Sequence, residues 1–180
     1  MKFALVIVLV AALDGAALAQ GAPPPARGSP PASAQVSPSQ IVVSGWRYVC
    51  DSSTGAFACQ VNDVVSVRGS GATVAAVRVR IANETKSPIV AVQVPLGIAV
   101  AHGVRLGFEN GALQTLPIFT CDQRGCFATA ELGGPVLAGM RAAKLPLRVA
   151  YEALNGTAEQ TISVQLGLAD FPAAYDQLKK

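Results

Sequence analysis

Short apolar segments separated by turn-forming residues fill the chain from residue 41 onward. Within residues 73–82, three apolar residues alternate with Arg78 and Arg80, and this period of two predicts a strand with one face toward solvent. Similar segments predict strands at residues 46–50, 57–61, 89–94, 104–108, 113–116, 118–121, 126–129, 145–152 and 159–166. Roughly nine or ten short strands with very little helix favour an all-β fold, an antiparallel β-sandwich or jelly-roll-like body.

Four turn signals predict how these strands pair. Asn110-Gly111 and Asn155-Gly156 are strong hairpin signals, because both residues tolerate the positive φ of a tight turn. Thr54-Gly55 predicts a further hairpin, formed by strands 46–50 and 57–61. The loop 122–125 predicts a fourth, in which its Gly supplies the positive φ.

Two short helices are expected near the C-terminus. The Gly-Gly-Pro at residues 133–135 breaks the sheet, and Pro135 suits the first position of a helix over residues 136–143. Asp170 can cap a helix that runs to residue 178. Its apolar face, spaced for docking on the sheets, consists of Phe171, Tyr175 and Leu178.

The N-terminal part of the chain predicts export. Residues 1–19 contain a short basic start, an apolar stretch and Ala17-Leu18-Ala19, which fits signal-peptide cleavage before Gln20. An uncleaved anchor is the alternative, but the apolar stretch is too short to span a bilayer. Residues 20–40 hold six Pro and no Leu, Ile or aromatic residue, so we expect a disordered linker. Residues 41–180 then form one β domain, and no integral membrane span remains after cleavage.

The distribution of charge along the chain argues against a nucleic-acid partner. The chain carries 14 Lys and Arg against 11 Asp and Glu, a net charge of +3, and removal of residues 1–19 takes away one residue of each sign. The basic residues are spread along the chain rather than clustered. Nucleic-acid binding needs a concentrated basic face, so we do not expect it.

The four cysteines of an exported chain indicate two disulfides. Of the three connectivities available, we predict Cys50–Cys59 and Cys121–Cys126, because each pair lies opposite across a predicted hairpin. A zinc site built from all four thiolates is the competing interpretation. Only Cys121 and Cys126 come near the spacing of a zinc knuckle, which favours the disulfides.

No set of residues in the chain predicts catalysis. The one His, His102, lies in an apolar segment before Gly103, and no Gly-x-Ser-x-Gly nucleophile motif occurs. We therefore predict no catalytic, cofactor-binding or metal site, and a protein that is not an enzyme. A hydrolase would need two converging carboxylates, which we do not expect. The carboxylates mostly border turns or strand ends: Asp51, Asp63, Glu84, Glu109, Asp122, Glu131, Glu152 and Glu159.

Four groups of short motifs follow one another between residues 46 and 178. They are Trp46 with Cys50 and Cys59; Val94-Pro95-Leu96-Gly97-Ile98 with Gly103-Val104-Arg105-Leu106; Leu116-Pro117-Ile118-Phe119-Thr120-Cys121 with Gly125-Cys126-Phe127-Ala128; and Val164-Gln165-Leu166-Gly167-Leu168-Ala169-Asp170-Phe171 with Ala173-Ala174-Tyr175. In this order, the motifs resemble the invasion-associated locus B family of exported Gram-negative bacterial proteins. In this chain Ile118 stands between Pro117 and Phe119, where the family often has Pro-Phe directly. A one-residue insertion changes the sheet face that Phe119 occupies.

The resemblance implies a small β-rich protein of the cell envelope, in a family named for a role of some members in host-cell invasion and hence virulence. It transfers no catalytic residue. We therefore predict an exported, non-enzymatic protein-interaction module of the periplasm or cell envelope, with secretion as the other destination. Its partner would be an envelope or host protein. The alternative is a periplasmic small-ligand carrier, for which a wide apolar gap between the sheets would be expected.

Overall fold

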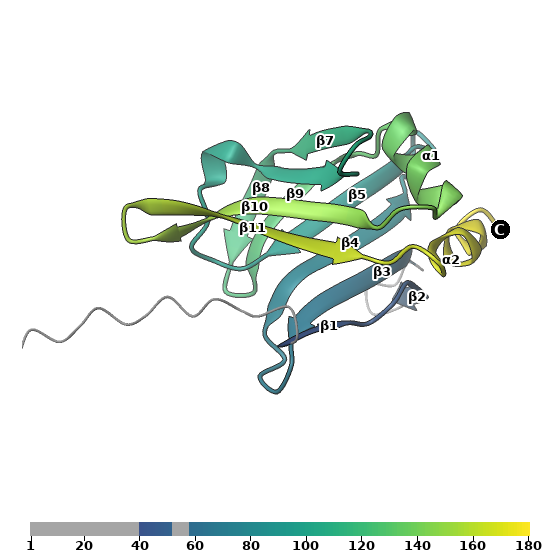
Figure 1. Cartoon of the computed structure of the whole chain (residues 1–180). Helices are drawn as coiled ribbons and strands as arrows, with labels where there is room; N and C mark the ends of the chain where they lie inside the picture. Colours follow the sequence, from purple (N-terminus) through teal and green to yellow (C-terminus); the bar gives the residue numbers. More distant parts are fainter. Residues whose placement is uncertain (1–39, 52–57) are drawn as a thin grey trace, which may run out of the picture. The chain divides into compact units, whose positions relative to one another are not determined.

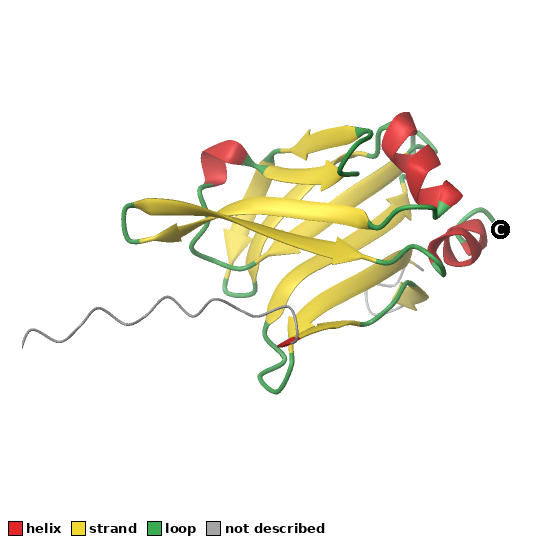
Figure 2. Ribbon diagram, viewed as in Figure 1, coloured by secondary structure: helices red, strands yellow, loops and turns green. Residues whose placement is uncertain are grey.

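The computed structural model describes residues 40–51 and 58–180. These residues form two antiparallel sheets packed as a sandwich, with two α-helices side by side at one end (Figure 1, Figure 2). This confirms the predicted antiparallel sandwich and its short C-terminal helix. The predicted signal peptide, residues 20–39 of the predicted linker and the Thr54-Gly55 turn lie outside the described residues, and the domain boundaries stay predictions.

The larger sheet has seven strands, in the order β1-β3-β4-β5-β9-β8, with β2 also paired to β3. β1 and β2 pair with successive parts of the same long strand, β3. β8 forms the opposite edge. The strands are β1 (Ile41–Val43), β2 (Arg47–Asp51), β3 (Ala58–Val67), β4 (Thr73–Ile81), β5 (Pro88–Val94), β8 (Ile118–Asp122) and β9 (Gly125–Glu131).

The smaller sheet has four strands in the order β11-β10-β6-β7. They are β6 (Val104–Gly107), β7 (Leu113–Leu116), β10 (Leu147–Asn155) and β11 (Ala158–Leu166). A 3-10 helix, η2 (Val100–His102), precedes β6. The α-helices are α1 (Gly134–Ala142), with Pro near its start as predicted, and α2 (Phe171–Gln177).

Alternating apolar side chains from both sheets fill the space between them. Val61, Val79 and Val90 of the larger sheet and Leu106 and Leu147 of the smaller one are fully buried. Each such side chain stabilises the fold by roughly 1.5–3 kcal/mol relative to leaving it in water. The core therefore lies between the sheets, as the period-two pattern predicted.

One buried hydrogen bond joins the two sheets directly. The Tyr151 hydroxyl of β10 donates to the backbone oxygen of Val74 in β4, at 3.1 Å. Burial raises the pKa of Tyr151 to about 12, so the hydroxyl keeps its proton across the physiological pH range.

Trp46 anchors the C-terminal helix. Its indole Nε1 donates to the backbone oxygen of Gly167 at 2.8 Å, and its ring meets Phe171 edge-on at 4.8 Å between centroids. Phe171 stacks in turn on Tyr175 at 5.4 Å. The expected docking of this helix is confirmed, but the expected cap is wrong: Asp170 precedes the helix, and its side chain makes no capping hydrogen bond.

The hairpin predicted at Asn110-Gly111 forms, and the amide of Phe108 donates to the oxygen of Ala112 to close its loop. One turn prediction and one strand prediction need correction. The last hairpin turns at Gly156-Thr157, one residue later than predicted, because Asn155 still pairs with Ala158. β3 runs on to Val67 instead of ending at Val61.

Asp63 lies within β3, in the interior of the protein. Its carboxylate is fully buried, and Oδ1 accepts from the Ser44 hydroxyl at 3.0 Å and the Val64 amide at 2.7 Å. Oδ2 has no hydrogen-bond partner among the described residues. Burial raises the pKa of Asp63, although these hydrogen bonds oppose the shift. The expectation that this carboxylate borders a turn is therefore wrong.

Candidate functional site

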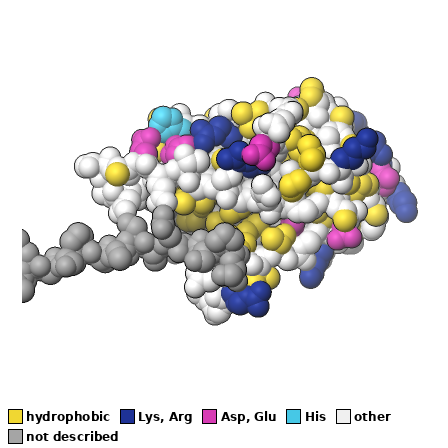
Figure 3. Space-filling view, in the orientation of Figure 1, with side chains coloured by type: hydrophobic (Ala, Val, Ile, Leu, Met, Phe, Trp, Pro, Cys, Tyr) yellow, Lys and Arg dark blue, Asp and Glu magenta, His cyan; other side chains and the backbone are white. Residues whose placement is uncertain are grey.

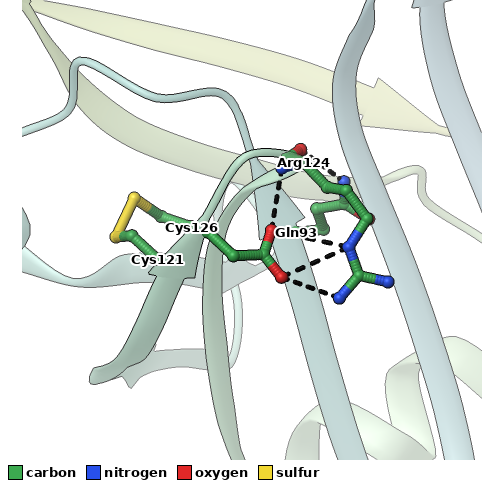
Figure 4. The surroundings of a disulfide bond; sticks show 5 residues. Gln93, Cys121, Arg124 and Cys126 are labelled. Carbon is green, nitrogen blue, oxygen red and sulfur yellow. Dashed lines mark hydrogen bonds and ion pairs between the residues drawn. A yellow bond between two sulfur atoms is a disulfide. The ribbon is translucent and has the colours of Figure 1, made fainter.

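The hairpin of β8 and β9 is the most distinctive surface feature of the larger sheet. Cys121 pairs directly with Cys126, and a disulfide joins them across the hairpin (Figure 4). Asp122 pairs with Gly125, so only Gln123 and Arg124 form the loop. This is the hairpin that the sequence predicted, with a shorter loop.

Gly125 fixes how closely this hairpin approaches the next strand. Its φ of 133° lies in the region that favours glycine. A Cβ at this position would overlap the backbone oxygen of Val94 in β5. Both the turn and the close approach to β5 therefore require glycine.

A hydrogen-bonded bridge ties the hairpin loop to two interior strands. Arg78 of β4 donates to Oε1 of Gln93 in β5 at 3.0 Å, and Nε2 of Gln93 donates to the backbone oxygen of Arg124 at 2.8 Å. Gln93 is nearly buried, and both its amide oxygen and its amide nitrogen have hydrogen-bond partners, as buried polar groups require. Burial and the charge of Arg124 lower the pKa of Arg78. No local sequence pattern predicts this bridge.

The loop is also ordered by its own side chains. The Asp122 carboxylate accepts from the Arg124 amide at 2.8 Å and from the Arg124 guanidinium at 2.7 Å (Figure 4). These contacts lower the pKa of Asp122, so the carboxylate stays ionised at neutral pH. The guanidinium also lies 5.4 Å from the centre of the Phe127 ring.

A β-bulge displays Phe119 on the edge strand. Ile118 pairs with Ala128 and Thr120 with Phe127, which leaves Phe119 as an extra residue between them. Its side chain is 77% exposed, more than any other large apolar side chain described. The inserted Ile118 was the sequence signal for a shift in the strand register at Phe119. It did not predict how exposed the Phe119 side chain is.

The second disulfide joins β2 and β3, on the side of the larger sheet away from β8. Cys50 pairs with Cys59 across β2 and β3, and the two are covalently linked. All four cysteines are therefore in disulfides, which excludes a zinc site made from their thiolates. In the described part of the chain, no group of three or more His, Cys, Asp or Glu side chains is placed to hold a metal ion.

His102 lies in an exposed polar cluster on the smaller sheet. Its Nε2 is 3.2 Å from Glu159, and both side chains are about half exposed. Glu152 of β10 accepts hydrogen bonds from the Thr161 hydroxyl and from Arg105, each at 2.7 Å, and these hydrogen bonds lower its pKa. The expectation that no two carboxylates converge in one cleft stays a prediction.

The structure gives no support to the apolar carrier. The space between the sheets holds fully buried Val and Leu side chains, and a pocket of about 720 Å³ lies at the surface beside α2 instead. No helix in residues 40–51 and 58–180 is long and apolar enough to cross a membrane.

Comparison with known proteins identifies the family. The model of the invasion associated locus B (IalB) protein family matches residues 46–179. A crystal structure of invasion associated protein b from Bartonella henselae shares 25% sequence identity, with a TM-score of 0.61 over 74% of this chain and 90% of that one. No curated protein matched the chain. The family match spans nearly all of the folded body, so the chain belongs to the invasion associated locus B family.

Proposed function

We propose that this protein is a non-enzymatic module of the bacterial cell envelope that binds another protein through Phe119. The observation that carries the proposal is the exposure of this ring on the bulged edge strand of a cross-linked hairpin. Large apolar side chains are costly to expose, and aromatic residues are enriched in protein interfaces. We infer that Phe119 inserts into an apolar pocket of the partner.

Rigidity of the hairpin favours this role. The Cys121–Cys126 disulfide joins its strands, and the bridge through Gln93 holds its loop on the sheet. A partner that binds a preorganised surface orders fewer groups on association. The free energy of burying Phe119 is then available for affinity.

Exposed polar residues follow Phe119 along the same hairpin. Thr120, Asp122 and Arg124 are exposed, and the last two form an ion pair on the surface. An apolar centre with a polar rim is the common composition of interfaces that form and dissociate. We expect the rim to set specificity and association rate more than affinity.

The engagement of the polar side chains supports a role without catalysis. His102 is paired with Glu159 at the surface, and both oxygens of Glu152 accept hydrogen bonds from other side chains. His102, Glu159 and Thr161 are all exposed residues, whereas an activated general base and its nucleophile usually lie in a cleft.

Export to the envelope is supported by three features: both disulfides, the family, and the signal-like N-terminal sequence. A role in host-cell invasion would follow if the partner is a host protein.

Mass spectrometry of the protein isolated from the periplasmic fraction tests the export prediction. We expect an N-terminus at Gln20, and an intact residue 1 in the membrane fraction would contradict it.

Photo-crosslinking tests the binding site. The photoreactive residue p-benzoylphenylalanine is placed at position 119, and at Leu145 as a control, because Leu145 is also exposed but lies between α1 and β10. After irradiation of intact cells, we expect a specific protein adduct from position 119 and much less of it from position 145. No adduct, or equal yields from both positions, would refute the proposal.

A further inference from the structure

A second surface site lies where β3, β4 and the β4–β5 turn of the larger sheet meet the C-terminal end of the chain. A pocket of about 720 Å³ opens between the β4–β5 turn and the C-terminal part of α2. Four basic residues line it: Arg80, Lys86, Lys179 and Lys180. Its volume lies within the usual range for sites that hold small molecules. Lys and Arg side chains are visible at the α2 end of the molecule in Figure 3.

The charged side chains that line this pocket are all positive. None of its described lining side chains is acidic, and Glu84 of the same turn is not among them. Within residues 40–51 and 58–180, no ion pair involves Arg80, Lys86 or Lys179. Like charges that converge without a counter-charge repel one another, and an anion in the pocket would relieve that repulsion.

The backbone at Lys86 is held in a disfavoured conformation. Its φ of 57° is left-handed, a conformation that is uncommon and strained for residues other than glycine. Two backbone hydrogen bonds maintain it: the Lys86 amide donates to Ala82 at 3.0 Å, and the Ala82 amide donates to Ser87 at 2.9 Å. The turn thereby keeps the Lys86 side chain at the pocket.

The remaining wall of the pocket is partly apolar. Ile81, Leu178 and Tyr175 contribute to it, and the ammonium of Lys179 lies 5.2 Å from the centre of the Tyr175 ring. Arg141 approaches the same ring but is neutralised by Asp176 at 3.1 Å. The pocket thus offers unpaired positive charge beside an apolar surface.

We propose that this pocket binds a small organic molecule that carries phosphate. A phosphate monoester carries nearly two negative charges at neutral pH and accepts hydrogen bonds from several directions. The cations approach the pocket from β4, from the β4–β5 turn and from the end of α2. A phosphate group can accept hydrogen bonds from all three directions, whereas a single carboxylate has fewer acceptor positions. The apolar wall would contact the organic part of the ligand.

The phosphate can belong to a soluble molecule or to a lipid headgroup, and two probes distinguish these sources. Calorimetry measures binding of sodium pyrophosphate, and flotation measures binding to vesicles of phosphatidylcholine with 20% phosphatidic acid, a fraction chosen as roughly that of an anionic membrane surface. Binding of pyrophosphate indicates a soluble ligand, whereas binding to the vesicles alone indicates a lipid. Either result supports the site only if the pocket variant described below weakens that binding and its matched control does not.

The variant Arg80→Gln/Lys86→Asn removes two charges, and Asn tolerates the left-handed backbone at position 86. Arg68→Gln/Lys144→Asn is the matched control, because it makes the same change in charge at exposed residues outside the pocket. We expect the pocket variant to weaken binding by about tenfold or more, and the control by less than about twofold. Equal loss in both variants, or no binding of either probe to the wild type, would overturn the proposal.

Discussion

Loss of the Cys121–Cys126 disulfide should lower stability by an amount that the loop length predicts. The bond joins residues five apart in sequence, so it closes a loop of about six residues. The chain-entropy relation gives about 2.2 kcal/mol for such a loop, and about 2.7 kcal/mol for the longer loop closed by Cys50–Cys59. For a folded body of this size, 2.2 kcal/mol corresponds to a decrease in melting temperature of about 7 °C.

The measurement uses Cys50→Ala/Cys59→Ala, which retains only the hairpin disulfide. Thermal unfolding is followed by circular dichroism in the oxidised and the reduced protein. Reduction leaves both sulfur atoms in place, and this matters because Cys126 is nearly buried and its truncation would add a packing cost. The difference between the two melting temperatures therefore reports the covalent link alone.

A decrease of about 7 °C on reduction would support this account of the hairpin. A decrease of less than about 2 °C would refute it, because the β8–β9 pairing and the bridge through Gln93 would then hold the hairpin without the bond. A loss of folding altogether would also contradict the loop-entropy estimate. As a control, the protein with all four cysteines replaced by Ala should not respond to the reductant.

Three further predictions concern single residues. Gly125→Ala should destabilise the protein by about 2–3 kcal/mol in urea denaturation, because its Cβ would overlap the Val94 oxygen at a φ that only glycine favours; an unchanged midpoint would contradict the close approach. Asp63→Asn removes a buried group whose folded-state pKa is raised, so the stability of the wild type relative to this variant should fall as the pH rises above about 4; a constant difference would show that Asp63 does not titrate differently on unfolding. Trp46→Phe should cost about 1–2 kcal/mol in the same denaturation assay, since the Gly167 oxygen loses its donor; no loss would mean that water replaces the indole.

Local signals predicted the hairpins well. The Cys121–Cys126 pairing followed from the tight loop and its glycine, and both disulfides join residues that are direct cross-strand partners. Asn110-Gly111 also lies in the loop of the predicted hairpin, but Phe108 is nearly buried in the core, the strand ends at Gly107 and the loop is longer than a two-residue turn. Tertiary packing there decides the length of the loop.

Features that depend on several strands were not visible in the sequence. The bridge from Arg78 through Gln93 to the hairpin requires the registers of β4, β5 and β9 together. The basic pocket likewise combines Arg80 with lysines about 100 residues later in the chain. These basic residues are dispersed in the sequence and come together only in the folded chain.

The most direct test of the central claim is the affinity of the protein partner captured at position 119. Biolayer interferometry measures its dissociation constant for the wild type, for Phe119→Ala and for Leu145→Ala. An anchoring aromatic residue contributes about 2 kcal/mol or more, so Phe119→Ala should weaken binding by about 30-fold while Leu145→Ala stays within about twofold. Equal affinities for the wild type and Phe119→Ala would contradict the claim that this ring is the binding anchor.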